Sequence, residues 1–266
     1  MTTPDADAPT SAAGPRVRPV PAVSRAIAIL RLLGGSATPM TLKTISQSLD
    51  MVTSTCLHIL RVLVDEGLVK VDAATKRYSL DTGMLTLARS VIERHPFPAL
   101  VQPVLDRIAA DWGVTALGVE VQGTDELVVL ALARSRAPFG LHVDVGSRFA
   151  AMTSATGRLV AAHAQLSAAE LARRFKAARW DNPPDLDTWT KEVEQVRRKG
   201  YSVDRGNYVG GLLILAVPVF DAVGRMTHAL VAAGFAEQLG APRVQALAKE
   251  LQAEAQQLTG LLGMRS

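Results

Sequence analysis

A run of polar residues, Thr53-Ser54-Thr55 followed by His58 and Arg61, falls on the outer side of a segment whose inner side is apolar. When such a helix enters the major groove of DNA, its first side chains can contact base edges or phosphates, and its first amides can bind a phosphate oxygen. A three-helix module that docks onto another protein can carry the same polar face. Thr53 would then only cap the helix, and His58 would only lie on the surface. The spacing by itself leaves both interpretations open.

The remaining reactive side chains argue against catalysis. Five histidines are scattered without the spacing of a metal site: His58, His95, His142, His163 and His228. The sequence has no G-x-S-x-G, P-loop or G-x-G-x-x-G motif, and its single cysteine, Cys56, falls on the inner side of its helix. Asp204 is a carboxylate without an evident partner. We therefore expect no enzyme activity, no metal and no cofactor.

Composition and charge narrow the class of protein further. The chain has 266 residues, 48% hydrophobic and 20% charged, which suits one large or two ordinary globular domains. Its longest apolar runs fall short of the ~20 residues of a membrane-spanning helix, and one cysteine fits a reducing compartment. We therefore expect a cytoplasmic protein with no membrane partner. Residues 16–95 hold eleven Lys or Arg against six Asp or Glu, an excess of positive charge that favours a polyanionic partner for that part.

The N-terminal third has the pattern of a small helical domain. Residues 1–21, rich in Thr, Ala, Pro, Asp and Ser, predict a disordered tail. A first helix is expected after Ser24 as N-cap, a short second one after Thr41, and a third over residues 53–66. Two extended runs, at 68–72 and 77–80, predict a hairpin with a basic tip. Residues 22–81 therefore fit a winged helix-turn-helix domain, followed by a linker helix over residues 82–95 that ends before Pro96.

Residues 96–263 predict a second domain in which helices and strands are mixed. Helices are expected at 101–112, 153–165, 168–179, 186–199 and 243–262. Strands are expected at 116–121, 126–133, near 141–143, 212–220 and 227–233. Antiparallel pairs surrounded by helices favour a sensor-type α/β sheet over a doubly wound parallel sheet. The fold class predicted for the whole chain is α+β.

Motifs spread along the whole chain resemble the IclR family of bacterial transcriptional regulators. In the N-terminal part they are residues 23–30, 42–46, 54–60, 63–69, the wing residues Lys76-Arg77-Tyr78-Ser79-Leu80, and residues 83–88. In the C-terminal part they are Gly146, Ala155-Thr156-Gly157-Arg158, residues 200–204 and residues 216–221. Each motif is weak alone, but their common order and spacing from Val23 to Leu262 identify the chain as a member.

The resemblance implies binding of double-stranded operator DNA. The residues that would contact DNA are Thr41, Lys43, Thr53, Ser54, Thr55, His58, Arg61, Lys76 and Arg77. Many members carry an arginine at the position of His58, which implies a contact that is altered, weakened or made pH-sensitive. The family also implies a homodimer or a dimer of dimers, so we expect a homotetramer in solution, with the linker helix packing against its mate through Met84, Leu87 and Val91. It does not distinguish an activator from a repressor.

For the C-terminal domain, the resemblance implies a GAF- or PAS-like sensor of a small organic acid. Its pocket would include Met152, Ser154, Ala155, Thr156, Gly157, Asp204, Asn207, Ile214, Val231 and Ala233. Amides at the helix start could hold a carboxylate. Val231 and Ala233 replace hydroxyl residues that bind small carboxylates in some members, and buried apolar surface contributes ~25 cal/mol per Å². We expect an aromatic or other hydrophobic acid in preference to glyoxylate or pyruvate. Alternatively, these residues are ordinary core, and the domain binds no ligand and serves only oligomerisation.

Overall fold

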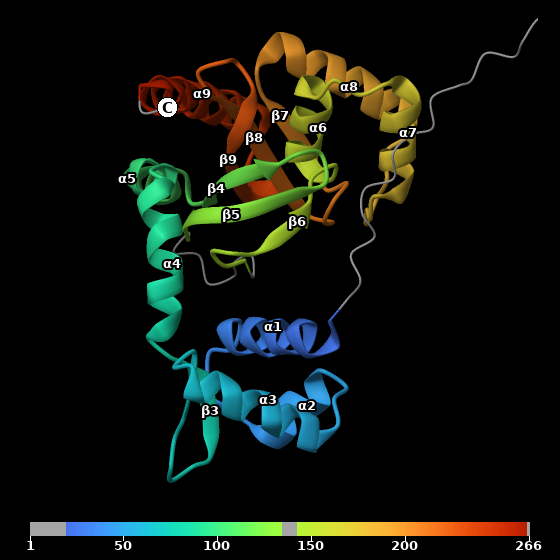
Figure 1. Ribbon diagram of the computed structural model, residues 1–266. Helices are drawn as coiled ribbons and strands as arrows, with labels where there is room; N and C mark the ends of the chain where they lie inside the picture. The colour runs from blue at the N-terminus through green and yellow to red at the C-terminus, as the bar shows by residue number, and fades with distance from the viewer. Residues whose placement is uncertain (1–19, 135–142, 265–266) are drawn as a thin grey trace, which may run out of the picture. The chain divides into compact units, whose positions relative to one another are not determined.

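A computed structural model describes residues 20–134 and 143–264, with the backbone alone at residues 91–94. The chain divides into two compact units, one ending at Arg94 and the other beginning at His95 (Figure 1). The first contains helices and a small hairpin sheet, and the second a large sheet covered by helices. The predicted α+β class is confirmed.

The N-terminal unit is a winged helix-turn-helix. Its elements are α1 (Pro21–Gly34), β1 (Met40–Thr41), α2 (Leu42–Ser48), α3 (Thr53–Asp65), β2 (Val69–Val71), β3 (Arg77–Leu80) and α4 (Gly83–Arg94). The three strands pair antiparallel in the order β1-β3-β2. Its buried side chains come from α1, α2, α3 and β2, and they are Ile29, Leu33, Ile45, Cys56, Leu60, Leu63 and Val69.

Two features of this unit differ from the sequence prediction. Helix α1 begins at Pro21, the last residue of the predicted tail, because the fixed backbone angle of proline suits the first helical position. Ser24 is therefore inside the helix instead of capping it. Strand β1 was not predicted, since two residues are too few to show a period, and it pairs with a strand almost forty positions away.

The C-terminal unit contains one six-stranded antiparallel sheet in the order β6-β5-β4-β9-β8-β7. The strands are β4 (Thr115–Gln122), β5 (Glu126–Ala133), β6 (Arg148–Ala150), β7 (Ser202–Arg205), β8 (Leu212–Phe220) and β9 (Met226–Phe235). The helices are α5 (Phe97–Trp112), α6 (Ser154–His163), α7 (Ala168–Ala177), α8 (Leu186–Lys199) and α9 (Ala241–Gly263). A short 3₁₀ turn, η1 (Ala236–Gln238), precedes α9.

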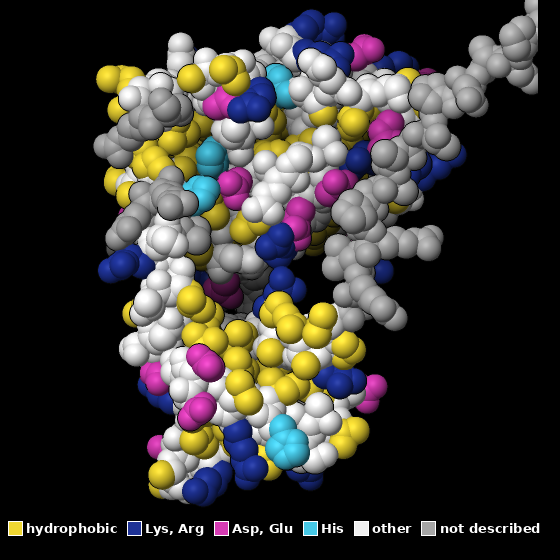
Figure 2. Space-filling view, viewed as in Figure 1, with side chains coloured by type: hydrophobic (Ala, Val, Ile, Leu, Met, Phe, Trp, Pro, Cys, Tyr) yellow, Lys and Arg dark blue, Asp and Glu magenta, His cyan; other side chains and the backbone are white. Residues whose placement is uncertain are grey.

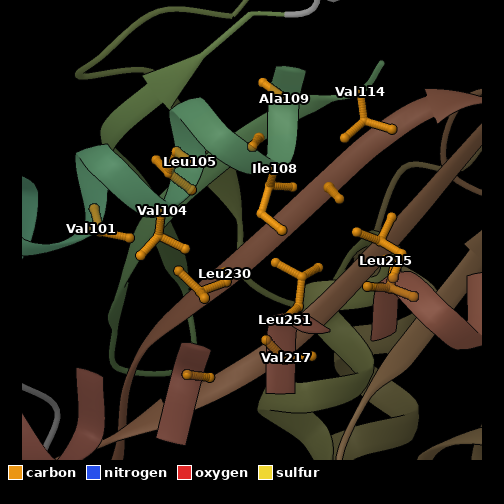
Figure 3. Packing of buried hydrophobic residues seen from close by; sticks show 14 of the residues in the cluster. Val101, Val104, Leu105, Ile108, Ala109, Val114, Leu215, Val217, Leu230 and Leu251 are labelled. Carbon is orange, nitrogen blue, oxygen red and sulfur yellow. The ribbon is translucent and has the colours of Figure 1, made fainter. Parts of the chain in front are cut away.

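Helices cover both faces of this sheet. Side chains of α5, including Val104 and Ile108, meet Leu215, Leu230 and others on one face, where α9 also packs (Figure 3). The other face packs against α6 and α8. Because successive strand residues point to opposite faces, the central strands β8 and β9 are buried on both sides. This alternation sends Ile214, Val231 and Ala233 towards α6.

Several bounds in this unit also differ from prediction. Helix α5 begins at Phe97, four residues early, because Pro98 lies in its first turn, where no intrahelical amide bond is needed. Strands β6 and β7 were missed. The strand expected near residues 141–143 falls partly outside the described residues, and Val143 itself is not in a strand.

Candidate DNA interface and effector cavity

Helix α3 is positioned by the turn before it and by the wing sheet. Asp50 adopts a left-handed backbone conformation (φ 47°) between α2 and α3. The Thr41 hydroxyl caps α2 by accepting a hydrogen bond from the Thr44 amide (3.2 Å). Thr41 also pairs with Arg77 of the wing. One residue therefore joins the helix-turn-helix to the wing.

The predicted DNA-contacting residues of α2 and α3 gather on the outside of the unit. Thr41 and Thr55 are half-buried, and the others are exposed: Lys43, Thr53, Ser54, His58 and Arg61. Ser54, His58 and Arg61 recur at i, i+4 and i+7, so they form one stripe on the side of α3 opposite its buried residues. Val52, the N-cap, provides no side-chain cap. The first amides of α3 can therefore bind an anion.

The wing turn is shaped by Asp72. Its carboxylate accepts hydrogen bonds from the Thr75 hydroxyl (2.7 Å), the Thr75 amide (2.6 Å) and the Ala74 amide (3.1 Å), and these bonds, that of the Thr75 hydroxyl most of all, lower the pKa of Asp72. Lys76 follows with φ 54° and makes no hydrogen bond or ion pair through its side chain within the described chain. Arg77 instead donates from Nη1 to the Pro39 carbonyl (3.0 Å). Figure 2 shows basic side chains gathered at the wing end of this unit.

Two exposed apolar residues, one directly before α3 and one within it, are not among the predicted contacts. Val52 is 71% exposed at the start of α3, and Val62 is 61% exposed in its second half. An apolar side chain at the start of a groove-binding helix can contact the methyl group of thymine. In the sequence, the position of Val52 directly before the Thr53-Ser54-Thr55 run could have indicated this contact.

In the C-terminal unit, an apolar cavity of about 80 Å³ lies between the sheet and the start of α6. Strand residues form much of its wall, and the lining residues are Leu117, Val119, Leu127, Val143, Phe149, Thr153, Ser154, Thr156, Tyr208, Ile214, Val231 and Ala233. Ligand pockets are commonly roughly 300–1,000 Å³. This cavity is therefore small, and its walls are almost wholly hydrocarbon.

The start of α6 brings polar groups to this apolar space. Thr153, the N-cap, does not cap the helix, because its hydroxyl donates to the Ala150 carbonyl (2.9 Å). Ser154 follows in a left-handed conformation (φ 60°). The first turn of α6 thus keeps its amides uncapped beside the hydroxyls of Ser154 and Thr156. Such a helix start favours negative charge, so the site suits an anionic group on an apolar body.

The structure brings five of the predicted effector residues to the cavity: Ser154, Thr156, Ile214, Val231 and Ala233. Met152 and Ala155 are buried in the surrounding hydrophobic cluster. Gly157 is buried where a Cβ would lie 2.3 Å from the carbonyl carbon of Met152, so this position requires glycine. Asp204 and Asn207 are not among the residues that line this cavity.

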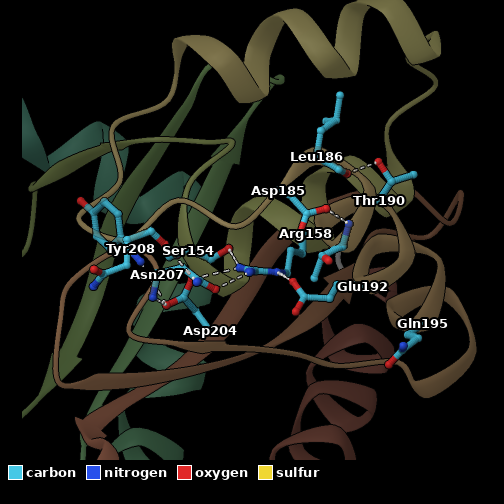
Figure 4. Close-up of polar contacts among 12 residues, drawn as sticks. Ser154, Arg158, Asp185, Leu186, Thr190, Glu192, Gln195, Asp204, Asn207 and Tyr208 are labelled. Carbon is cyan, nitrogen blue, oxygen red and sulfur yellow. Dashed lines mark hydrogen bonds and ion pairs between the residues drawn. The ribbon is translucent and has the colours of Figure 1, made fainter.

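Asp204 and Asn207 instead surround Arg158, whose side chain is 1% exposed (Figure 4). Arg158 Nη1 donates to Asp204 (3.0 Å) and to the Ser154 carbonyl (3.0 Å), Nε to Glu192 (2.7 Å), and Nη2 to Asn207 (2.9 Å). A buried charge is stable only when it is paired and hydrogen-bonded. Arg158 is therefore the partner that the sequence did not reveal for Asp204, from a position 46 residues earlier.

Arg158 also lines a second, more polar cavity of about 330 Å³ between α8, β7 and the start of α9. Glu192, Lys199 and Arg205 contribute charges to it. Within residues 20–134 and 143–264, no group of three or more His, Cys, Asp or Glu side chains could hold a metal ion.

His228 on β9 is the most strongly perturbed histidine among the described residues. Its ring stacks on Phe97 at 4.0 Å between centroids, and Nδ1 lies 3.0 Å from the Thr227 hydroxyl. Burial lowers the pKa of His228 to about 4. The imidazole is therefore neutral near pH 7 and acts as a packing group on the side of the sheet covered by α5.

Both units match models of one protein family. Residues 22–73 match the IclR helix-turn-helix domain, and residues 89–259 match the bacterial transcriptional regulator IclR C-terminal domain. The chain belongs to the IclR family. The resemblance noted from its motifs is thereby confirmed.

Curated relatives span nearly the full length of this IclR-family chain. The transcriptional repressor AllR of Escherichia coli K12 is 24% identical over 248 residues, covering 92% of this chain and 91% of AllR. The regulator BhcR of Paracoccus denitrificans is 24% identical over 241 residues, covering 90% and 86%.

Solved structures show the same fold. An IclR regulator from Alicyclobacillus acidocaldarius superposes with a TM-score of 0.75 at 25% identity, covering 92% of this chain and all of that one. HmgR of Pseudomonas aeruginosa gives a TM-score of 0.69 at 22% identity, covering 92% and 100%.

The family assignment fixes the general function. The chain is a transcriptional regulator with a DNA-binding helix-turn-helix domain and an IclR C-terminal domain. Its relatives and family models are regulators and not enzymes. None of the helices in the described part of the chain is long and apolar enough to cross a membrane.

Proposed function

We propose that this regulator binds operator DNA through the exposed stripe of α3 and the wing residue Lys76, and that a hydrophobic monocarboxylic acid in the apolar cavity changes that binding. One observation carries the effector proposal: the uncapped start of α6 opens on a cavity to which the strands of the sheet contribute only apolar side chains. A carboxylate would accept hydrogen bonds from the first-turn amides and from the hydroxyls of Ser154 and Thr156. The apolar body would then rest on Ile214 and Val231.

The floor of the cavity favours hydrocarbon over a second polar group. Ile214, Val231 and Ala233 offer no side-chain hydrogen-bond partner to the carbonyl oxygen of a keto acid. Burying that oxygen without a partner would cost free energy, whereas a methyl or phenyl group would gain from burial. The preferred acids are therefore apolar ones such as isobutyrate or benzoate, in preference to glyoxylate or pyruvate.

Thermal-shift and calorimetric titration with these four acids tests the effector proposal. We expect isobutyrate and benzoate to raise the melting temperature and to give measurable binding heats, with weaker effects from the two keto acids. Ser154→Ala should weaken binding of the apolar acids, whereas Ser147→Ala, which lies outside the cavity, should leave their binding unchanged. A preference of the wild-type protein for glyoxylate or pyruvate would refute this effector class.

A second candidate function is a regulator whose C-terminal domain binds no effector and serves only assembly. The volume of the cavity, about 80 Å³, favours this alternative. Operator binding measured with each of the same acids distinguishes the two functions. An effector changes DNA affinity to the extent that it binds one arrangement of the protein better than another, whereas a domain that serves only assembly leaves DNA affinity unchanged. DNA binding unaffected by every acid would favour the assembly function.

We further propose that two N-terminal units act as a pair within a cytoplasmic homodimer or dimer of dimers. Leu87 on α4 is 60% exposed and lies three residues after the half-buried Met84, so the two share a face of the helix that a second α4 could cover; the Val91 side chain lies outside the described residues. Paired heads would read half-sites about 34 Å apart, or a multiple of that distance. Light scattering measures the assembly directly, and a monomer mass would contradict it.

A further inference from the structure

Tyr208 is a cavity residue that the sequence did not single out. It is the one cavity-lining residue from the loop of residues 206–211 between β7 and β8. Phe149 is the other aromatic residue among those that line the cavity. Tyr208 is half-buried and packs against the hydrophobic cluster that surrounds the cavity. Its phenol ring therefore takes up space beside the place proposed for the effector.

The backbone of Tyr208 is held on both sides. Its amide donates to Asp204 Oδ1 (3.2 Å), and its carbonyl accepts from the Asp181 amide (3.3 Å). Asp204 is itself fixed by the buried ion pair with Arg158. These bonds place the start of the Tyr208 side chain at a defined distance from the start of α6.

The rest of the loop is also tied to the segment between α7 and α8. The Asn182 amide donates to the Asn207 carbonyl (3.0 Å), Asn207 Nδ2 to the Asn182 carbonyl (3.1 Å), and the Gly210 amide to Asp181 Oδ2 (3.0 Å). Gly206 (φ 77°) and Gly211 (φ 78°) supply left-handed turns at the two ends of the loop. The loop is thus a fixed wall of the cavity.

The ring of Tyr208 points away from the Arg158 cluster (Figure 4). Its hydroxyl makes no hydrogen bond with the described residues. Burial and the nearby Asp181 carboxylate raise the pKa of the phenol, so it stays protonated near pH 7. Within the folded chain the residue therefore contributes mainly the bulk of its ring.

We propose that Tyr208 is the specificity-determining residue of the apolar cavity: its ring limits the length of the hydrophobic acid that fits between the start of α6 and the 206–211 loop. This inference rests on the proposed function of the cavity. The ring of Tyr208 is then one of the groups that keep the volume of this apolar cavity to about 80 Å³. The wild-type protein should bind short acids such as isobutyrate and bind 3-phenylpropionate much more weakly.

The test compares four variants of the full-length protein by calorimetric titration with isobutyrate, benzoate and 3-phenylpropionate. Tyr208→Ala and Tyr208→Val remove the ring, and Tyr208→Phe removes only the hydroxyl. Tyr201→Ala is the matched control, because Tyr201 is a half-buried tyrosine of the same unit that packs against the hydrophobic cluster on the opposite face of the sheet. The Val variant provides a second readout if the Ala variant does not fold.

We expect the ratio of isobutyrate to 3-phenylpropionate affinity to move towards the longer acid by about tenfold or more in the Ala or Val variant, as for other changes in apolar pocket volume. Tyr208→Phe and Tyr201→Ala should keep the wild-type ratio. An unchanged ratio in the Ala and Val variants would overturn the role of Tyr208 while leaving the effector site intact, as would an equal change in the Phe variant. No binding of any acid to any of the proteins would overturn the proposed effector function itself, and this inference with it.

Discussion

The two units of this regulator use positive charge in opposite ways. Arg61 and Lys76 in the N-terminal unit are exposed and make no side-chain hydrogen bond or ion pair within the described chain. Arg158 in the C-terminal unit is 1% exposed, and its guanidinium binds Asp204, Glu192 and two oxygens of other residues. An exposed cation remains available to a phosphate, whereas a buried one has to be paired. Substitution of Arg61 or Lys76 should therefore affect DNA binding, and substitution of Arg158 should affect folding.

The largest effect is expected for Arg158→Met. The variant would leave Asp204, which is fully buried, without its ionic partner, and such losses cost about 3–5 kcal/mol of unfolding free energy. Urea denaturation followed by circular dichroism measures the change. Arg148→Met is the matched control, since its ion pair with Glu126 is solvent-exposed and such pairs contribute about 0–1 kcal/mol. Equal losses of unfolding free energy in the two variants would contradict the expected difference between a buried and an exposed ion pair.

The next largest effect concerns pH and His228. Its pKa is lowered from 6.5 to about 4 by burial, so between these pH values the unfolded chain binds a proton that the folded chain does not. Unfolding free energy should therefore fall as pH drops through this interval, by up to about 3 kcal/mol from His228. His228→Phe, which keeps a ring against Phe97, should lose less unfolding free energy between pH 7 and pH 4.5 than the wild-type protein does. Urea titrations at several pH values decide this, and parallel pH dependence in both proteins would contradict it.

In the N-terminal unit, Arg61→Ala should weaken binding to the promoter fragment. Loss of a guanidinium contact to a base costs about 1–3 kcal/mol and should also reduce the preference over random duplex. The unfolding free energy should change by less than about 0.5 kcal/mol, because the side chain is exposed. Fluorescence anisotropy with both duplexes measures the affinities, with Arg173→Ala in the C-terminal unit as control. A variant with wild-type affinity would remove Arg61 from the interface.

A smaller and less specific effect is expected for Lys76→Ala. If Lys76 contacts only phosphate, its removal should weaken binding to all duplexes equally. It should also reduce the slope of log affinity against log salt by about 1. Anisotropy at several salt concentrations gives this slope. Lys191→Ala, an exposed lysine of α8, should leave it unchanged. A sequence-dependent loss for Lys76→Ala would instead indicate contact with a base.

The two units also differ in what the sequence could predict, because the features of the first follow from local periodicity and some of those of the second depend on residues far apart in the chain. The exposed stripe of α3 could be predicted from the helical period within its thirteen residues. The side of the sheet to which Ile214, Val231 and Ala233 point could be predicted from strand alternation. Arg158 and Tyr208 could not be found in this way. Arg158 is paired with Asp204, and the Tyr208 carbonyl is bound by the Asp181 amide, and both partners are distant in the sequence, so the folded chain and not a local pattern brings them together.

The most direct test of the account is anisotropy of the full-length protein on its own promoter fragment and on random duplex, with and without isobutyrate or benzoate. We predict a clear preference for the promoter fragment and a change in its affinity of about fivefold or more with an apolar acid, within the range of known allosteric couplings. Equal binding to both duplexes, unaffected by every acid, would contradict it.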